Sequence, residues 1–533
     1  MGGTNQFPQI AKKIGGILGA GVIVLIGFYL FFGEQILYSL RGQQVDLRNA
    51  PRGENEVLTI GYAFAPQGLN PVLFDPLTRS ALVDVYQGLV KTDRSLKIEP
   101  AIAISWGRLD DLTWEFRLRP DVQFHDGQTV TPRDVVTSIE YALQADESQL
   151  KNLLNTISSV EENGPDMVRI KTMVPDPLLL TKLSVTYIFP ERYDDFDKPV
   201  GTGPYRLLSR SESTIKLSRF EDYWGALPAF KNVDLLFIPE RRDRIKALED
   251  GTIQLLANLP PTAGCSFNSN FKDAEGCSAM KTASISVKSV PSLEVSFLAM
   301  NLYNDLFSDK TVRVAIGKSF DRSVFVDLAY GFARPAYQFV SSGVFGFDPD
   351  LTAPDFDLAS AQADVAKVLG DSFETASVTF DYPQSLESVG QYVREQFRDL
   401  GIDVELNPVS DSELQKKILS GESDLYYLGW RSELGDASDF LQAVAHSANP
   451  AKGYGQFNGT HYANKKVDQL IEESAKNLDP QTRLEQMQEA MKIIVQDDVM
   501  ALPLFESETI FAFLNGIQFE PRVDGYVYAS EIR

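Results

Sequence analysis

Hydrophobic residues along the chain alternate with polar ones in some segments and recur at helical spacing in others. Residues 114–118 place apolar side chains at every second position, which predicts a half-buried strand. Residues 131–142 open with a Thr-Pro-x-Asp capping pattern and continue with apolar residues at i, i+4 and i+7. This pattern predicts a helix that packs one face on a core.

The second half of the chain alternates helical and strand-like segments more regularly. Apolar stripes over 361–369 and 389–400 each end before a glycine, and 402–406 then alternates as a strand does. A Ser-x-x-Glu capping box opens the stripe over 410–418, and an apolar run follows at 424–430. Helices and strands in this order predict an α/β fold with mixed sheets and at least partly parallel strands.

The N-terminal segment contains an apolar run of membrane-spanning length. Residues 14–33 include no charged residue, and twenty helical residues reach about 30 Å, the thickness of a hydrocarbon core. Two lysines precede the run, so we expect 1–13 to stay cytoplasmic, 34–55 to form a stalk, and the main domain to lie on the periplasmic or extracellular side. The chain would then be a single-pass protein of the cytoplasmic membrane.

A cleaved signal peptide is the alternative interpretation of the same run. Signal peptides usually have 7–15 apolar residues and a small-x-small cleavage site. Here the run is longer, and no Ala-x-Ala sequence follows it. The pattern therefore favours an uncleaved anchor.

Length and charge narrow the classes of function. The chain has 533 residues, too many for one ordinary core, so two or three lobes are expected. It carries 50 Lys and Arg against 73 Asp and Glu, a net charge of −23. This acidity argues against nucleic acid as a partner, because binding it would need a basic face.

The residues needed for common enzyme chemistry are scarce. With two cysteines and three histidines, a zinc ribbon or iron–sulfur cluster is excluded, and we expect neither a metal nor another cofactor. No Gly-x-Ser-x-Gly motif occurs, so the sequence does not indicate an enzyme. Outside the cytoplasm Cys265 and Cys277 could form a disulfide, while two free buried thiols are the alternative.

Short motifs spread over residues 57–515 carry a family resemblance. The most specific is WEFRLRPDVQFHDGQTVTPRDVV at 114–136, and GLNP at 68–71, VGTGPY at 200–205 and DLYYLGW at 424–430 accompany it. Together they resemble the peptide/nickel-type (family 5) extracellular solute-binding proteins of ABC importers, which are similar to dipeptide- and oligopeptide-binding proteins.

The resemblance implies a bilobal clam of the type II-like, large cluster C form. Lobe I would comprise 56–289 and 503–533, and lobe II 290–502, with crossings near 290 and 502. A ligand, with a short peptide favoured over other small solutes, would be held between the lobes and delivered to ABC permease subunits. The alternative is a transport-inactive sensor or scaffold subunit of a membrane complex.

The resemblance also implies candidate ligand-binding residues. Trp430 matches the aromatic of the family's Gly-Trp-x-x-Asp segment, and Glu433 stands at its acidic position, where the carboxylate would hold a peptide's α-ammonium group. Asp436 matches the next acidic position but could instead cap a helix. Arg431 is a candidate partner for an anionic ligand group. Tyr86 is expected near the cleft, with a core role equally open.

Overall fold

The computed structural model describes residues 57–533, apart from 275, 279, 281–282, 353 and 371–376. The predicted cytoplasmic tail, anchor and stalk (1–13, 14–33 and 34–55) lie outside the described residues. Within the described part of the chain, none of the helices combines the length and the apolar character needed to cross a bilayer.

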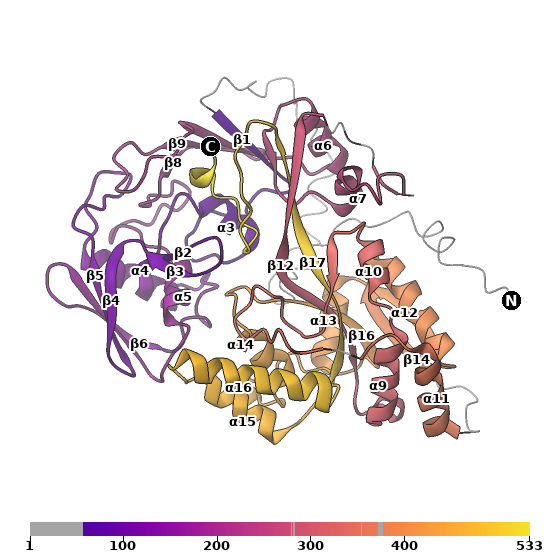
Figure 1. Ribbon diagram of the computed structural model, residues 1–533. Coiled ribbons are helices and arrows are strands. Elements are labelled where there is room, and N and C mark those ends of the chain that lie inside the picture. Colours follow the sequence, from indigo (N-terminus) through magenta and orange to yellow (C-terminus); the bar gives the residue numbers. More distant parts are fainter. Residues whose placement is uncertain (1–56, 275, 279, 281–282, 353, 371–376) are drawn as a thin grey trace.

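Two long antiparallel strands, β12 (Ile285–Met300) and β17 (Ala501–Leu514), run side by side through the middle of the molecule (Figure 1). They pair from Ile285 opposite Leu514 to Ala299 opposite Ala501, and the register shifts after Pro291. The predicted crossings, near 290 and 502, fall inside these two strands. We call them the hinge strands, because one sheet extends from them into both halves of the molecule.

The half beyond β17, which we call lobe I, contains most of the N-terminal part of the chain and its last residues. Its strands in the large sheet are β11 (Leu255–Leu256), β1 (Val57–Tyr62), β10 (Asn232–Phe237), β9 (Thr214–Arg219) and β8 (Tyr205–Arg210). Two smaller sheets consist of β2 (Val90–Thr92) with β3 (Ile98–Pro100), and of β4 (Ala103–Asp110), β5 (Thr113–Leu118), β7 (Met167–Thr172) and β6 (Ile157–Glu162). Its helices are α3 (Pro76–Leu82), α4 (Pro132–Gln144), α5 (Leu179–Val185), α6 (Arg241–Glu249) and α7 (Pro261–Gly264).

The half beyond β12 is lobe II. Its strands are β16 (Leu425–Arg431), β14 (Ser377–Pro383) and β15 (Asp403–Val409), with β13 (Ala333–Pro335) paired to β17. Its helices are α8 (Asp305–Ser308), α9 (Lys310–Ser319), α10 (Ser323–Leu328), α11 (Leu358–Leu369), α12 (Glu387–Asp399), α13 (Asp411–Ser420), α14 (Ser438–Phe440), α15 (Lys465–Ser474) and α16 (Pro480–Lys492).

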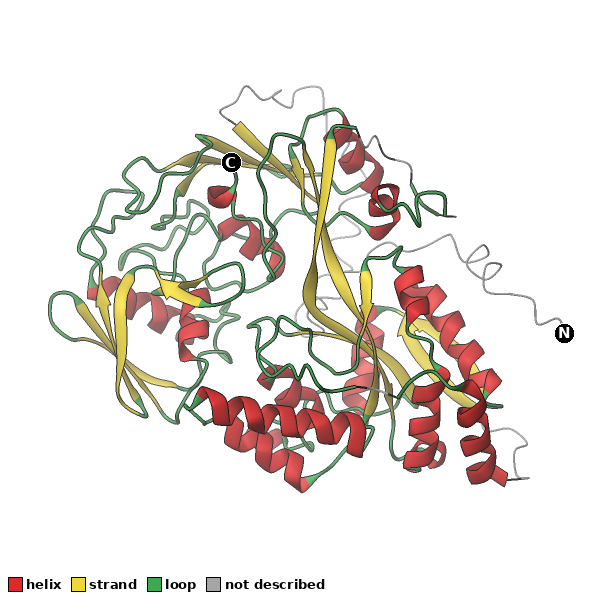
Figure 2. Cartoon of the chain, viewed as in Figure 1, coloured by secondary structure: helices red, strands yellow, loops and turns green. Residues whose placement is uncertain are grey.

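Lobe II buries both faces of its sheet (Figure 2). One face packs Phe297 and Leu428 against α14 and α16, and the other packs Leu298 and Phe380 against α9 and α12. Two covered faces are typical of sheets with parallel strands, and β14 pairs in parallel with both β15 and β16. The predicted α/β fold with mixed sheets is therefore confirmed.

Local patterns placed several elements correctly. The alternating segment 114–118 lies in β5, between β4 and β7. In the capping box of α4 the backbone N–H of Thr131 donates to Asp134 at 2.8 Å. Such contacts depend on neighbours in sequence, and the sequence therefore shows them directly.

The C-terminal segment, residues 515–533, is fastened to lobe I by buried polar contacts. Arg522, only 1% exposed, donates to the carbonyls of Thr92 and Asp93 at 3.1 and 3.0 Å, and it forms ion pairs with Asp524 at 2.9 Å and Glu531 at 3.0 Å. The carboxylate of Asp84 accepts a hydrogen bond from the backbone N–H of Ala529 at 2.6 Å. These contacts fix the position of residues 524–526.

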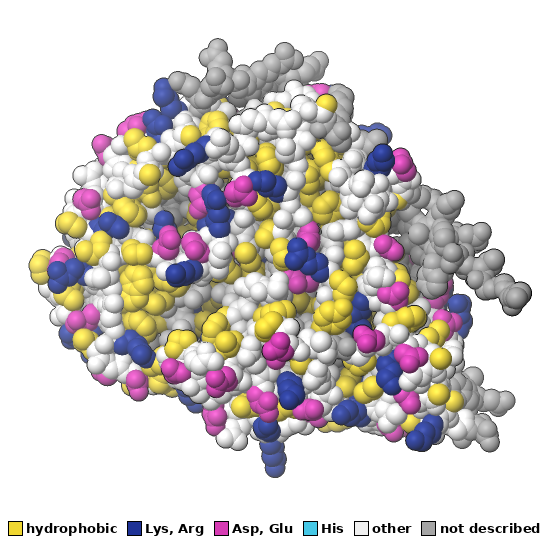
Figure 3. Space-filling model, in the orientation of Figure 1, with side chains coloured by type: hydrophobic (Ala, Val, Ile, Leu, Met, Phe, Trp, Pro, Cys, Tyr) yellow, Lys and Arg dark blue, Asp and Glu magenta, His cyan; other side chains and the backbone are white. Residues whose placement is uncertain are grey.

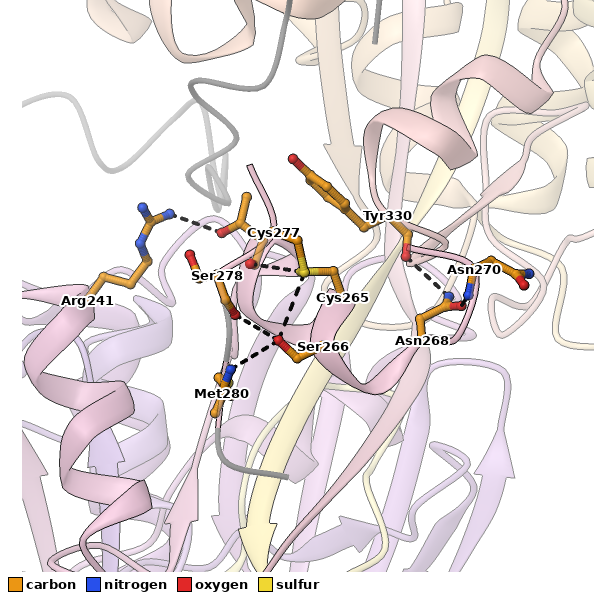
Figure 4. Close-up of a disulfide and its surroundings, with 10 residues drawn as sticks. Arg241, Cys265, Ser266, Asn268, Asn270, Cys277, Ser278, Met280 and Tyr330 are labelled. Carbon is orange, nitrogen blue, oxygen red and sulfur yellow. Dashed lines mark hydrogen bonds between the residues drawn. A yellow bond between two sulfur atoms is a disulfide. The ribbon is translucent and has the colours of Figure 1, made fainter. Parts of the chain in front are cut away.

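The structure joins Cys265 and Cys277 in a disulfide directly after α7 (Figure 4). Beside it, the Ser266 hydroxyl donates to the Ser278 carbonyl at 2.7 Å. The bridge and this hydrogen bond close a short loop on the surface of lobe I. A structural disulfide fits an oxidising compartment outside the cytoplasm.

Candidate ligand-binding site

A cavity of about 220 Å³ lies between the two lobes beside the hinge strands. Lobe I contributes the start of α3, residues 258–261 and the turn 524–526; lobe II contributes α10, the start of α12 and the end of β16. Much of the wall is apolar, from Phe325, Leu328, Phe332, Leu386, Val389 and Phe505. Its volume is below the roughly 300–1,000 Å³ of most ligand pockets, so in this conformation it suits a small solute or one part of a larger one.

The C-terminal segment reaches this cavity through a tight turn. Gly525 has a φ of 75°, a left-handed conformation that favours glycine, and its N–H donates to the Arg522 carbonyl at 3.0 Å. The N–H of Tyr526 donates to the Asp524 carboxylate at 3.0 Å. The turn thereby holds Asp524 and Tyr526 against the end of β16 in lobe II.

Arg431, at the end of β16, lines the cavity and connects the lobes. Its Nε lies 3.0 Å from a carboxylate oxygen of Glu433, and its Nη2 donates to the Asp524 carbonyl at 2.7 Å. The structure thus brings two predicted site residues together, but as partners of each other. β16 ends at Arg431, and Glu433 lies in the turn that follows, so the turn brings the two side chains together.

Glu433 itself is not among the residues that line the cavity. Its side chain is 12% exposed and faces Arg431, which neutralises its charge. In this conformation the predicted receptor for an α-ammonium group is therefore already occupied by a guanidinium group.

Trp430 points to the opposite face of β16 from Arg431. Its ring packs edge-on against Phe440 and Phe457, with centroids 6.2 and 5.6 Å away, in the core beneath α14. Successive residues of a strand alternate between its faces, so Trp430 and Arg431 cannot both face the cavity. The structure assigns Trp430 to packing rather than to the cavity wall.

Asp436 is 4% exposed and forms a buried ion pair with Arg483 of α16. The two guanidinium nitrogens lie 2.6 and 2.8 Å from its two oxygens. One oxygen also accepts the N–H of Ser438 at 3.0 Å at the start of α14, whose N-cap residue is Ala437. Both oxygens thus have internal partners, and the residue does not line the cavity.

Tyr86 is 1% exposed in the core of lobe I, where its ring stacks on Tyr187 with centroids 5.6 Å apart. It does not line the cavity. The structure therefore places Tyr86 in the core, which is one of the two roles that the sequence left open.

Glu294, which was not predicted from the sequence, lines the cavity from β12, directly opposite Arg431 in the antiparallel ladder. Within the described part of the chain its carboxylate has neither a hydrogen bond nor an ion pair. A Cβ atom on Gly429 would lie 2.9 Å from its Oε1, so the glycine of the Gly-Trp motif leaves room for this side chain. A lone acidic residue in the apolar run LEVSFLAM was the signal for it in the sequence.

Burial raises the pKa of the Glu294 carboxyl to about 7. The negative charge of Glu433 adds to this rise, and the positive charge of Arg431 opposes it. The cavity therefore has an apolar wall, an arginine held by two partners, and one carboxylate without a partner among the described residues. Among the described residues, no group of three or more His, Cys, Asp or Glu is arranged to hold a metal ion. This arrangement can bind a small solute, and a cationic group would find a partner in it.

Comparisons with known proteins agree with such a role. Residues 97–452 match the family described as bacterial extracellular solute-binding proteins, family 5 (middle region). The glutathione-binding protein GsiB of Salmonella typhi is 25% identical over 440 residues, covering 79% of this chain and 83% of GsiB. GsiB of Escherichia coli O6:K15:H31 is 24% identical over 467 residues, which cover 83% of this chain and 87% of that GsiB.

Solved structures share the fold. The ABC transporter substrate-binding protein CtaP of Listeria monocytogenes superposes with a TM-score of 0.77 at 22% identity, covering 90% of this chain and 99% of CtaP. The periplasmic binding protein DppA of Helicobacter pylori, in complex with the peptide STSA, superposes with a TM-score of 0.69 at 22% identity. The match covers 89% of this chain and 96% of DppA.

The buried pair of Asp436 and Arg483 yields a test of the structural role of Asp436. Arg483→Met leaves a buried carboxylate without its partner, which should lower the free energy of unfolding by roughly 3–5 kcal/mol. The double variant Asp436→Asn/Arg483→Met should recover part of this loss, because no lone charge remains. Urea denaturation of the variants measures both. If Asp436→Asn instead keeps the stability and abolishes ligand binding, Asp436 is a ligand residue.

The raised pKa of Glu294 predicts a pH-dependent effect on stability. The folded chain holds this proton up to about pH 7, whereas the unfolded chain loses it near 4.5. Wild-type stability should therefore fall between these values by roughly 2–3 kcal/mol relative to Glu294→Gln, and the difference should stay constant above pH 8. Thermal unfolding at several pH values measures the difference. Ser292→Ala, which removes no titrating group, is the control, and identical pH curves for wild type and Glu294→Gln would contradict the prediction.

Proposed function

The chain belongs to family 5 of the bacterial extracellular solute-binding proteins, and from this premise we propose that it captures a short peptide in the cavity between its two lobes. The proteins of this family are transport binding proteins, so the chain is a binding protein and not an enzyme, and its main domain works outside the cytoplasm. We propose three further points: that the ligand is a short peptide, that it is delivered to a permease, and that the chain is anchored in the membrane.

The observation that carries the proposal is the position of the cavity. Its walls come from both lobes, and the hinge strands form its back. A bend at the register shift after Pro291 would open and close these walls, as in other hinged binding proteins. A ligand in this place would contact both lobes at once and would thereby favour the closed arrangement.

The named relatives support a peptide-like ligand. GsiB is a glutathione-binding protein, and DppA was solved with the peptide STSA. Glutathione is itself a short peptide, so both names indicate the same class of solute. The apolar wall with a few charged groups is the kind of lining that ligand pockets have.

We further propose that residues 14–33 anchor the chain in the cytoplasmic membrane and that the lobes deliver the ligand to ABC permease subunits. An anchored binding protein works at a high effective concentration near its permease.

On the face shown in Figure 3, acidic and basic side chains are interspersed and do not form a large patch of one sign.

Native mass spectrometry of the full chain, purified gently from its host in mild detergent, tests this function. We expect a mass excess that resolves into short peptides after denaturation, and a raised melting temperature with glutathione or with members of a di- and tripeptide library. Ala329→Trp, which fills the cavity, should lose the bound mass, whereas Leu208→Trp on the exposed surface should keep it. A ligand-free chain that no peptide stabilises would contradict the proposal and favour a sensor or scaffold.

A further inference from the structure

One carboxylate faces the cavity without a partner among the residues that the structure describes, and we infer that this residue, Glu294, receives an ammonium group of the ligand. The inference rests on the proposed function and narrows it to solutes that carry an ammonium group close to an apolar group. It also moves the ammonium site from Glu433, the position that the sequence favoured, to the facing strand.

The charges around the cavity single out Glu294. Four charged residues line it: Glu294, Arg431, Glu508 and Asp524. Three of them form ion pairs: Arg431 with Glu433 at 3.0 Å, Glu508 with Arg334 at 2.9 Å, and Asp524 with Arg522 at 2.9 Å. Within the described part of the chain, Glu294 is left without such a pair. A cation that enters the cavity would therefore meet one carboxylate whose charge is not already neutralised.

The surroundings of Glu294 favour pairing with a cation from outside. Its Oε1 occupies the space over Gly429 that a Cβ atom would need, since such an atom would lie 2.9 Å from it. Arg431 cannot easily turn to it, because its guanidinium is held by Glu433 and by the Asp524 carbonyl. A carboxylate in so little water gains more from an ammonium group than an exposed one does.

The apolar part of the cavity wall defines the rest of the ligand. Phe325 and Leu328 of α10, with Phe332 after it, present apolar surface to the same cavity, and Leu386 and Val389 extend this surface. A branched aliphatic or aromatic group beside the ammonium would bury its apolar surface there, which favours binding. The N-terminal residue of a peptide with such a side chain has this combination of groups.

Protonation should couple to binding at this residue. Burial holds the pKa of Glu294 at about 7 without ligand, and a bound ammonium group would lower it. The charged or titratable groups that face Glu294 are Arg431 and Tyr427 of β16, Glu433 after it, Glu508 of β17, and Asp524 and Tyr526 of the C-terminal turn. These groups stay in place when the ligand binds, so the change in the pKa of Glu294 comes from the cation. The cation should therefore displace the proton of Glu294.

A matched pair of small probes tests the inference on the full chain. The 3-methylbutylammonium ion keeps its charge at about pH 8, as a lysine with a pKa of about 10.4 does, and 3-methylbutan-1-ol is its neutral counterpart. Titrations followed by ligand-observed NMR should show that wild type binds the cation roughly 10- to 100-fold more tightly than the alcohol. Glu294→Gln should lose this preference, and Glu294→Asp should retain part of it.

Glu506→Gln is the control. Glu506 is a hinge-strand carboxyl that is 7% exposed and whose pKa burial also raises to about 7, but it does not line the cavity. This variant should keep the preference for the cation. Equal binding of the two probes by wild type, binding of neither, or an unchanged preference in Glu294→Gln would overturn the inference.

The outcomes separate the inference from the proposed function. If Glu433→Gln abolishes the preference and Glu294→Gln does not, the ammonium site belongs to Glu433 and the inference is wrong. A chain that binds peptides without preferring a cationic group keeps the proposed function and loses the inference. If the chain prefers the cation at Glu294 but binds no peptide, the inference about Glu294 holds and the proposed peptide-binding function is wrong.

Discussion

The pairing of β12 with β17 is the constraint on which the rest of the structure depends. These strands are shared by both lobes, and their ladder runs from Ile285 opposite Leu514 to Ala299 opposite Ala501. Backbone hydrogen bonds in such a ladder allow twisting and bending but resist sliding, so the lobes can change their angle without losing their alignment. The cavity lies beside this ladder, where a small bend changes the distance between its walls.

Charge placement at this point follows from the same ladder. Glu294 and Arg431 stand opposite each other on neighbouring strands, yet Arg431 is engaged by Glu433 and by the carbonyl of Asp524. Arg431 thereby connects lobe II to the C-terminal segment of lobe I. An arginine held in this way lines the site without forming an ion pair with the facing carboxylate, which stays available to a ligand.

The sequence predicted the fold far better than the site. The capping box of α4 and the alternation in β5 are local, so the chain shows them without a structure. The site residues depend on distant segments: Asp436 meets Arg483, 47 residues later, and Arg431 meets the C-terminal turn. Family motifs located β16 correctly but could not show which of its residues face the cavity. Glu294 could not be predicted because its role depends on the lack of a partner within the described residues, which spacing along the chain does not show.

Proton release on binding tests the central claim, that the free carboxylate of Glu294 receives the cation, most directly. Calorimetry of 3-methylbutylammonium binding at pH 7, repeated in buffers with different ionisation enthalpies, counts the protons that leave the full chain. Since the carboxyl has a pKa of about 7 in the free cavity, about half a proton should be released per cation bound. Binding of the cation with no release of protons, or an equal release from Glu294→Gln, would contradict this account.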